Sequence, residues 1–409
     1  MTPVLSILPF LLLLLTMAFA PMLAPHWWES NRRKLVIVAA LALPVAATYL
    51  VLDSAALLHS VRDYLSFVIM LAGLFVVSAG IRLHGDLRAT PAVNTAFLAL
   101  GTLLASLVGT TGASLLLVRP LIETNQERTR VTHTIVFFIF LVSNIGGMLT
   151  PLGDPPLFLG YLAGVPFSWT LRLTPVWATM ALVLLGVYFV YDAAQFSREP
   201  AVARRLDRIQ TTPLRLEGTE NFVWLIAIVA AVALLSDPWR EAAIVIASAI
   251  SFARTPARVR HENRFAAAPM IEVAVLFLGI FVTMIPALHL LREHGATLGV
   301  REPWHFFWAT GLASSFLDNA PAYMAFLTLG QSLSLQPQVV GVPHALLAAL
   351  SVGAVAMGAN SYIGNAPNLM VKAIAEHAGI KMPGFAGYIA FSAMFLMPLF
   401  IAVTFVFFR

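Results

Sequence analysis

The chain has 409 residues, of which 59% are hydrophobic and only 11% are charged. Charged residues make up about one quarter of a typical soluble domain. This chain therefore cannot cover its surface with polar groups, and lipid must be its solvent. The absence of cysteine excludes disulfide frameworks and thiolate metal sites. The net charge of +5 does not indicate nucleic-acid binding, because the basic residues lie in short loops between apolar runs, where they orient a membrane protein.

A membrane-spanning helix needs about 20 mostly apolar residues. This rule predicts an all-α polytopic membrane protein whose ten crossings lie near residues 3–24, 35–52, 64–83, 132–165, 173–195, 221–236, 240–253, 270–290, 343–377 and 385–408. The first stretch could instead be a secretory signal. It lacks the basic region that normally precedes such a signal, so we interpret it as the first crossing.

Two further apolar stretches, 92–122 and 304–333, are long but interrupted in the middle. The interruptions are Gly109-Thr110-Thr111-Gly112 and Asp318-Asn319-Ala320-Pro321. Each stretch is predicted to be a re-entrant hairpin, which enters the membrane, turns at the interruption and leaves on the same side.

The basic residues give the orientation. With both hairpins re-entrant, eighteen Lys and Arg residues, Arg264 among them, lie on one face, and Arg119 lies within a hairpin. The other face carries six: Arg62, Arg172, Arg240, Arg292, Arg301 and Arg409. Because basic residues favour the cytoplasmic side, we expect a bacterial inner-membrane protein with both termini outside.

Each half then has five crossings and one hairpin, so the second half is inverted relative to the first. The predicted repeats are 1–195 and 221–409, joined by a cytoplasmic linker at 196–220. Local sequence supports the repeat, because Gly147-Met148-Leu149-Thr150-Pro151-Leu152-Gly153-Asp154-Pro155-Pro156 matches Gly358-Ala359-Asn360-Ser361-Tyr362-Ile363-Gly364-Asn365-Ala366-Pro367.

These matching segments cannot continue a helix. Proline lacks the amide hydrogen, and glycine costs about 1 kcal/mol per helical position relative to alanine. Freed backbone groups at membrane depth are tolerated only beside a cavity or a ligand. The segments 132–165 and 343–377 are therefore predicted to be broken helices around a binding site. The alternative is a proline kink satisfied by neighbouring helices.

Asp154 and Asp318 are the central candidates, because a carboxylate at the centre of a spanning helix costs at least about 2.5 kcal/mol. Such residues are usually paired, protonated or bound to a cation, although each could also cap the half-helix that follows. The remaining candidate side chains carry amides or hydroxyls: Thr110, Thr111, Ser143, Asn144, Thr150, Asn319, Asn360, Ser361, Asn365 and Asn368. Hard oxygen ligands suit Na⁺, and the predicted Na⁺ ligands are Asp154, Asn144, Asp318, Asn319 and Asn365.

Three other ionisable residues are predicted to lie outside the site. Arg119 follows the first hairpin turn and is expected to reach the cytoplasmic headgroups. His133 and Glu272 lie near predicted helix ends, and we interpret both as interfacial.

The segments Ser143-Asn144-Ile145-Gly146-Gly147, Gly153-Asp154-Pro155-Pro156 and Leu317-Asp318-Asn319-Ala320-Pro321 resemble those of the ion transporter superfamily. That group includes NhaD-type sodium/proton antiporters, citrate and dicarboxylate carriers, and arsenite permeases. The chain is most similar to bacterial proteins described as sodium/proton antiporters or citrate transporters. The resemblance implies that hairpin tips and breaks form the ion and substrate sites. Relatives are often dimers, so the resemblance also implies a homodimer. The first tip departs from the family pattern, because Thr110-Thr111 stands where Asp-Asn is common.

The first functional hypothesis is sodium/proton antiport, with Na⁺ and H⁺ competing for Asp154 and Asp318. The alternative is Na⁺- or H⁺-coupled symport of citrate or a dicarboxylate, held at half-helix N-termini. Arsenite or oxyanion efflux and a passive channel are weaker alternatives. We expect no enzyme and no cofactor beyond the transported ions, since no Ser-His pair, paired catalytic aspartate motif or His-Glu-x-x-His occurs.

Overall fold

The computed structural model describes residues 4–263, 265–333, 335 and 338–409. Within them the chain is all-α apart from one two-stranded sheet, and nineteen α-helices are present. Pro3, at the start of the first predicted crossing, and Arg264, in the predicted cytoplasmic group, lie outside the described residues.

Six helical segments of the described chain are long and apolar enough to cross a membrane: Asn31–Leu52, Ser54–Ser78, Pro91–Val108, Phe167–Ser197, Ala268–Leu298 and Phe385–Phe407. The chain is therefore a multi-pass membrane protein, as its composition predicts. The crossing predicted at 240–253 forms a helix, α12 (Trp239–Arg254), which does not belong to this apolar set.

The chain begins with a group of helices that pack on one another and on the later helix α14: η1 (Val4–Ile7), α1 (Leu8–Leu23), α2 (Pro25–Trp28), α3 (Asn31–Leu52) and α4 (Ser54–Ser78). The crossing predicted at 64–83 was wrong at both ends. Helix α4 begins at Ser54, where Asp53 caps it by accepting a hydrogen bond of 3.0 Å from the amide of Ala56. The length rule for apolar stretches missed this start because the first turns of α4 contain several polar residues.

After α4 the chain leaves the helix and forms strand β1 (Arg82–Asp86), which pairs antiparallel with β2 (Thr212–Glu217). The linker predicted at 196–220 thus contains the short helix α10 (Ala201–Ile209) and a strand. The side-chain amide of Asn221 donates to the carbonyl of Gly80 at 2.9 Å and fixes the start of the second half beside the end of α4. Local propensity could not predict a strand pair between such distant segments.

The rest of the first half contains α5 (Pro91–Val108), α6 (Thr110–Thr124), α7 (Thr132–Leu141), η2 (Ile145–Met148), α8 (Pro155–Leu162), η3 (Phe167–Leu173) and α9 (Thr174–Ser197). Gly109 alone joins α5 to α6. Its φ of 79° lies in the left-handed region, which favours glycine. Between α7 and α8 the only regular structure is the short η2 turn.

The second half contains α11 (Asn221–Leu234), α12, α13 (Ala257–Glu262), α14 (Ala268–His294), η4 (Gly295–Leu298), α15 (Pro303–Phe316), α16 (Asn319–Ser332), α17 (His344–Met357), η5 (Gly358–Asn360), α18 (Ala366–His377) and α19 (Phe385–Phe407). The α15–α16 and α17–α18 pairs are interrupted at Leu317-Asp318 and at 361–365.

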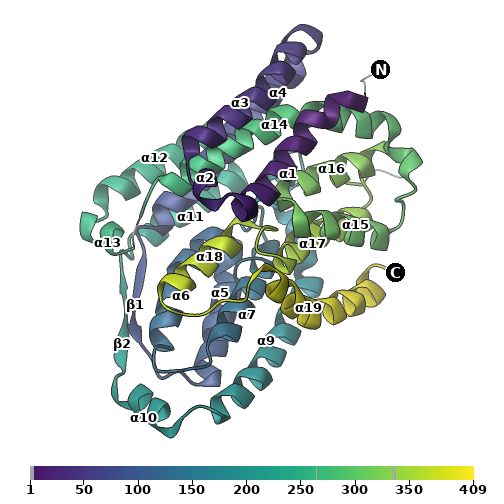
Figure 1. Ribbon diagram of the computed structural model, residues 1–409. Coiled ribbons are helices and arrows are strands. Elements are labelled where there is room, and N and C mark those ends of the chain that lie inside the picture. The colour runs from purple at the N-terminus through teal and green to yellow at the C-terminus, as the bar shows by residue number, and fades with distance from the viewer. Residues whose placement is uncertain (1–3, 264, 334, 336–337) are drawn as a thin grey trace.

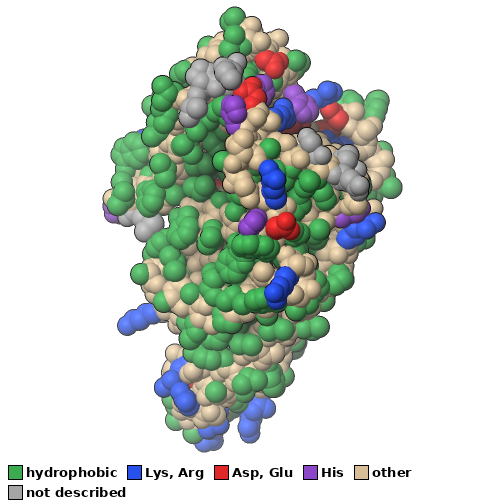
Figure 2. Space-filling view, turned by 90° about the vertical axis from the view of Figure 1, so that its right-hand side faces the viewer, with side chains coloured by type: hydrophobic (Ala, Val, Ile, Leu, Met, Phe, Trp, Pro, Cys, Tyr) green, Lys and Arg blue, Asp and Glu red, His purple; other side chains and the backbone are tan. Residues whose placement is uncertain are grey.

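The two halves pack closely together. Helix α18 packs on α6 and α7, and α16 packs on α8, so segments far apart in the sequence lie side by side near the middle of Figure 1. Hydrophobic side chains cover most of the middle of the face in Figure 2, and Lys and Arg side chains gather at its lower end. Figure 1 places α10 at that same end.

Candidate functional site

Four helix N-termini meet around one cavity of about 480 Å³. Helices α6, α8, α16 and α18 begin at Thr110, Pro155, Asn319 and Ala366, and a residue at or just before each start lines the cavity. The opposite wall comes from α1, α4 and the first turns of α14, and it is apolar except for Glu272. The volume is within the range of small-molecule sites, about 300–1,000 Å³.

Glycine pairs allow the chain to turn sharply before α8 and α18. A Cβ on Gly153 would lie 2.1 Å from the carbonyl oxygen of Gly147, and one on Gly364 would lie 2.5 Å from that of Gly358. Proline in the first turn of α8 and α18 has no amide hydrogen to satisfy and favours a helix start. The backbone at both interruptions is therefore held by residues that other side chains cannot replace.

Asp154 is the centre of the polar contacts behind the cavity wall. Its side chain is 1% exposed and does not line the cavity itself. The carboxylate accepts hydrogen bonds from Thr110 Oγ1 at 3.0 Å, from Asn319 Nδ2 at 2.6 Å and from Asn365 Nδ2 at 3.0 Å. It makes no side-chain capping bond to α8. One buried carboxylate thus connects the starts of four helices.

A network of amides extends from Asp154 into both interruptions. Asn365 Nδ2 also donates to the carbonyl of Ser143 at 3.0 Å, and Asn144 Nδ2 donates to Asn368 Oδ1 at 2.8 Å. Asn368 Nδ2 in turn donates to the carbonyls of Gly358 and Ser361, both at 2.9 Å. The carbonyls freed by the break after α17 are therefore partly satisfied by side chains, as backbone at membrane depth requires.

Asp318 has a different environment. It lines the cavity directly, and its side chain caps α16 by accepting from the amide of Ala320 at 3.2 Å. Thr111 also lines the cavity. The structure therefore brings Thr110, Ser143, Asn144, Asp154, Asn319, Asn365 and Asn368 into one bonded network, with Asp318 and Thr111 on the cavity side.

The other three candidates lie beside this network. The Thr150 hydroxyl donates to the carbonyl of Ser106, and the Ser361 hydroxyl donates to the carbonyl of Ser315 at 2.5 Å. Asn360 Nδ2 donates to Ser315 Oγ at 2.9 Å. These bonds hold each interruption against a helix from earlier in the chain, α5 or α15.

Four of the five predicted Na⁺ ligands lie in this network, and Asp318 lies on the cavity side. Both Asp154 oxygens accept hydrogen bonds from N–H or O–H donors. The buried Asn319 Oδ1 has no hydrogen-bond partner and is the oxygen at this network that is free to bind a cation. Among the described residues, no group of three or more His, Asp or Glu side chains is placed to hold a metal ion.

Residues 1–408 match the family model described as "Putative citrate transport". The chain belongs to this family. Membership makes it a membrane transport protein rather than an enzyme. No curated protein matches the sequence.

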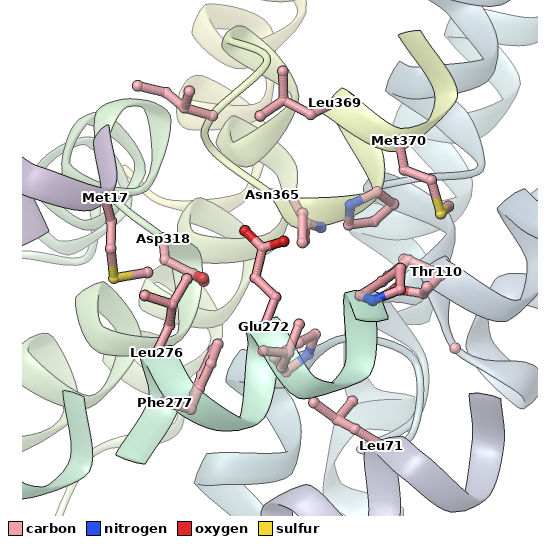
Figure 3. A pocket seen from close by; sticks show the side chains of 18 of the residues that line it. Met17, Leu71, Thr110, Glu272, Leu276, Phe277, Asp318, Asn365, Leu369 and Met370 are labelled. Carbon is pink, nitrogen blue, oxygen red and sulfur yellow. The ribbon is translucent and has the colours of Figure 1, made fainter. Parts of the chain in front are cut away.

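In this transporter, sequence reasoning missed one residue of the site. Glu272 was predicted to be interfacial, but it lines the cavity, and Figure 3 shows its side chain extending from α14 into the middle of it, between Asp318 and Asn365. Glu272 forms an ion pair of 2.7 Å with Lys34 of α3, whose side chain is 2% exposed. The signal in the sequence was a single carboxylate in the first turns of a long apolar helix.

Arg119 and His133 both have partners within the protein. Arg119 lines a smaller cavity of about 180 Å³ that shares Phe75, Pro269 and Met370 with the main one, and it donates to the carbonyl of Asn263 at 2.9 Å. His133 is buried and bonds Asp192 at 2.8 Å, which in turn pairs with Arg128 at 2.6 Å.

Proposed function

We propose that this protein is a secondary active transporter that uses a gradient of H⁺ or Na⁺ to move a small organic polycarboxylate such as citrate. The observation that carries the proposal is the meeting of four helix N-termini at one cavity. A helix N-terminus has a partial positive charge of roughly half an elementary charge, and broken-helix carriers bind carboxylates in this way. The family's description supports the same substrate class.

A coupling cation is needed because the cavity also presents carboxylates. Among the described residues that line it, Asp318 and Glu272 are acidic and none is Lys, Arg or His. A polyanion entering this cavity is repelled unless protons or Na⁺ neutralise these groups. Cation binding and anion binding therefore favour each other, which is the thermodynamic basis of coupled transport.

The proposed architecture is a pair of inverted repeats, 1–195 and 221–409, joined at 196–220. In each, a re-entrant hairpin (92–122 or 304–333) meets a broken helix (132–165 or 343–377). Equivalent bonds support the repeat, because the hydroxyl of Thr150 bonds the Ser106 carbonyl as Ser361 bonds Ser315. Alternating access follows if the hairpins and breaks move together against the wall formed by α1, α4 and α14, with both termini outside the cell.

Sodium/proton antiport is the second candidate. It is favoured by the acidic lining of the cavity and by the unpaired, buried Asn319 Oδ1. In that mechanism Asp154 and Asp318 carry Na⁺ in one direction and protons in the other, with no organic anion.

Proteoliposomes separate the two candidates. Uptake of radiolabelled citrate driven by an inward H⁺ or Na⁺ gradient is expected for the symporter, and Asp154→Asn is expected to abolish it. Asp207→Asn is the matched control, because Asp207 is equally buried but lies in α10, away from the cavity. Na⁺-dependent proton movement without citrate uptake would instead establish the antiporter and refute the proposal.

A further inference from the structure

The Lys34–Glu272 ion pair lies at the wall of the cavity, with Glu272 in the lining and Lys34 buried behind it. Lys34 is 2% exposed, and its ammonium lies 2.7 Å from Glu272 Oε1 and 5.3 Å from the centre of the Trp28 ring. Glu272 is 37% exposed, and its exposed side faces the cavity. Removing a lysine from water is costly unless it is paired, so Glu272 holds the ammonium in place behind itself.

We propose that Glu272 is the proton-coupling residue of this transporter and that Lys34 is the cation it exposes to the substrate's carboxylate. This inference rests on the proposed function of polycarboxylate transport. With Glu272 ionised, the pair is neutral and presents a carboxylate to the cavity. With Glu272 protonated, the charge on Lys34 is no longer compensated, and the ammonium attracts an anion.

The step balances in charge and protons. A proton from the solution that fills the cavity binds a Glu272 oxygen as the anion enters, and Lys34 exchanges its bond to Glu272 for one to the anion. When the anion leaves, the proton returns to solution and the Lys34–Glu272 bond forms again. A bound carboxylate and an ionised Glu272 repel each other, so the anion and the proton each increase the affinity for the other.

The charged surroundings of Glu272 are simple. Lys34 faces it from α3, and Asp318 faces the same cavity from the start of α16. Helix α1 carries no titratable side chain. In the first turns of α4, the side chains of His59, Arg62 and Asp63 line a different pocket. On α18, Lys372 pairs with Glu376. Glu272 and Asp318 are thus the carboxylates that an anion in the cavity meets.

The test is citrate binding by the purified full-length protein in nanodiscs, measured in sodium-free buffer between pH 6 and pH 8. If one proton binds with citrate, each unit rise in pH lowers the citrate affinity of the wild type by a factor about tenfold larger than that of a variant lacking the linked group. Glu272→Gln is expected to remove this difference, because its side chain cannot ionise. Citrate's own protonation is the same for both proteins and cancels in the comparison.

Lys34→Met is expected to weaken citrate binding at least about tenfold at every pH, since one charge-assisted contact is lost, and Lys34→Arg should restore much of it. Glu376→Gln is the matched control, because it breaks a Lys–Glu pair of the same 2.7 Å length on α18. It should keep the wild-type pH slope.

The inference is overturned if Glu272→Gln retains the wild-type pH slope, or if Lys34→Met binds as wild type does. These results leave citrate binding itself intact and so differ from a failure of the proposed function. That failure would show as no citrate binding by the wild type and by Glu376→Gln alike, and it would overturn both proposals.

Discussion

Asp154 offers a substitution that separates the charge of the site from its stability. In Asp154→Asn, the retained oxygen can accept from Thr110 and Asn365, which both bond Oδ1 of the wild-type side chain. The new amide nitrogen then faces Asn319 Nδ2, which lies 2.6 Å from Oδ2. Because Asn319 Oδ1 has no partner, a flip of the Asn319 amide creates an acceptor for the new donor.

The flip leaves Asn319 Nδ2 unpaired in place of Asn319 Oδ1, so the number of unsatisfied buried atoms stays the same. We therefore expect Asp154→Asn to change the free energy of unfolding by less than about 1 kcal/mol. Asp154→Ala removes the acceptor of three donors. Asn365 Nδ2 keeps its bond to the Ser143 carbonyl, but Thr110 and Asn319 lose their acceptor. Each orphaned donor costs about 1–3 kcal/mol, so this variant should lose at least about 2 kcal/mol. Both variants should fail to transport citrate.

Thermal unfolding of the purified variants measures their loss of stability, and citrate uptake into proteoliposomes measures their transport. The reasoning is refuted if Asp154→Ala unfolds at the wild-type temperature, because the carboxylate then does not hold the four helix starts together. It is equally refuted if Asp154→Asn transports normally, because the charge is then unnecessary.

Three further predictions concern the structure around the site. Asp192→Asn should destabilise the protein by about 3 kcal/mol in thermal unfolding, because it removes the nearer of the two carboxylates that pair with the buried Arg128 and leaves Glu199 at 3.8 Å; an unchanged unfolding temperature would contradict this. Gly153→Ala should abolish transport and lower the unfolding temperature, since its Cβ would lie 2.1 Å from a backbone oxygen, whereas Gly186→Ala, with nothing within 4 Å, should behave as wild type. Burial and the nearby Glu127, Asp207 and Glu123 raise the pKa of Asp86 to about 6. The folded protein therefore favours protonated Asp86, and this contribution to stability is lost as the pH rises from about 4 through 6. Asp86→Asn should accordingly raise the unfolding temperature at pH 8 but not at pH 4.

The interruptions could be predicted from sequence because their cause is local. Gly153, Pro155, Gly364 and Pro367 act through their own backbone, and the structure has no helix at 149–154 or 361–365. That Asp154 has hydrogen-bond partners could also be predicted, since a carboxylate in an apolar stretch needs them. The identity of these partners could not be predicted, because Asn319 and Asn365 lie in the other half of the chain. A single sequence does not show which distant residues are in contact.

The same limit explains the error at Glu272. Its position near a helix start suggested the membrane surface, but the cavity reaches the first turns of α14, and the buried Lys34 that pairs with it comes from α3. Strands β1 and β2 were missed for a related reason. Both are short, β1 is half-buried and β2 is largely exposed, and each pairs only with the other.

Charge balance explains why the two halves differ at their matching positions. In the proposed repeat Asn365 corresponds to Asp154, and Asn365 Nδ2 lies 3.0 Å from Asp154 Oδ1. An aspartate at 365 would place two carboxylates within hydrogen-bonding distance, and they could not both ionise in a buried site. An amide satisfies Asp154 instead and leaves a single negative charge at the centre of the network. The other candidate carboxylate, Asp318, lies at the cavity surface, where a transported cation or proton can reach it.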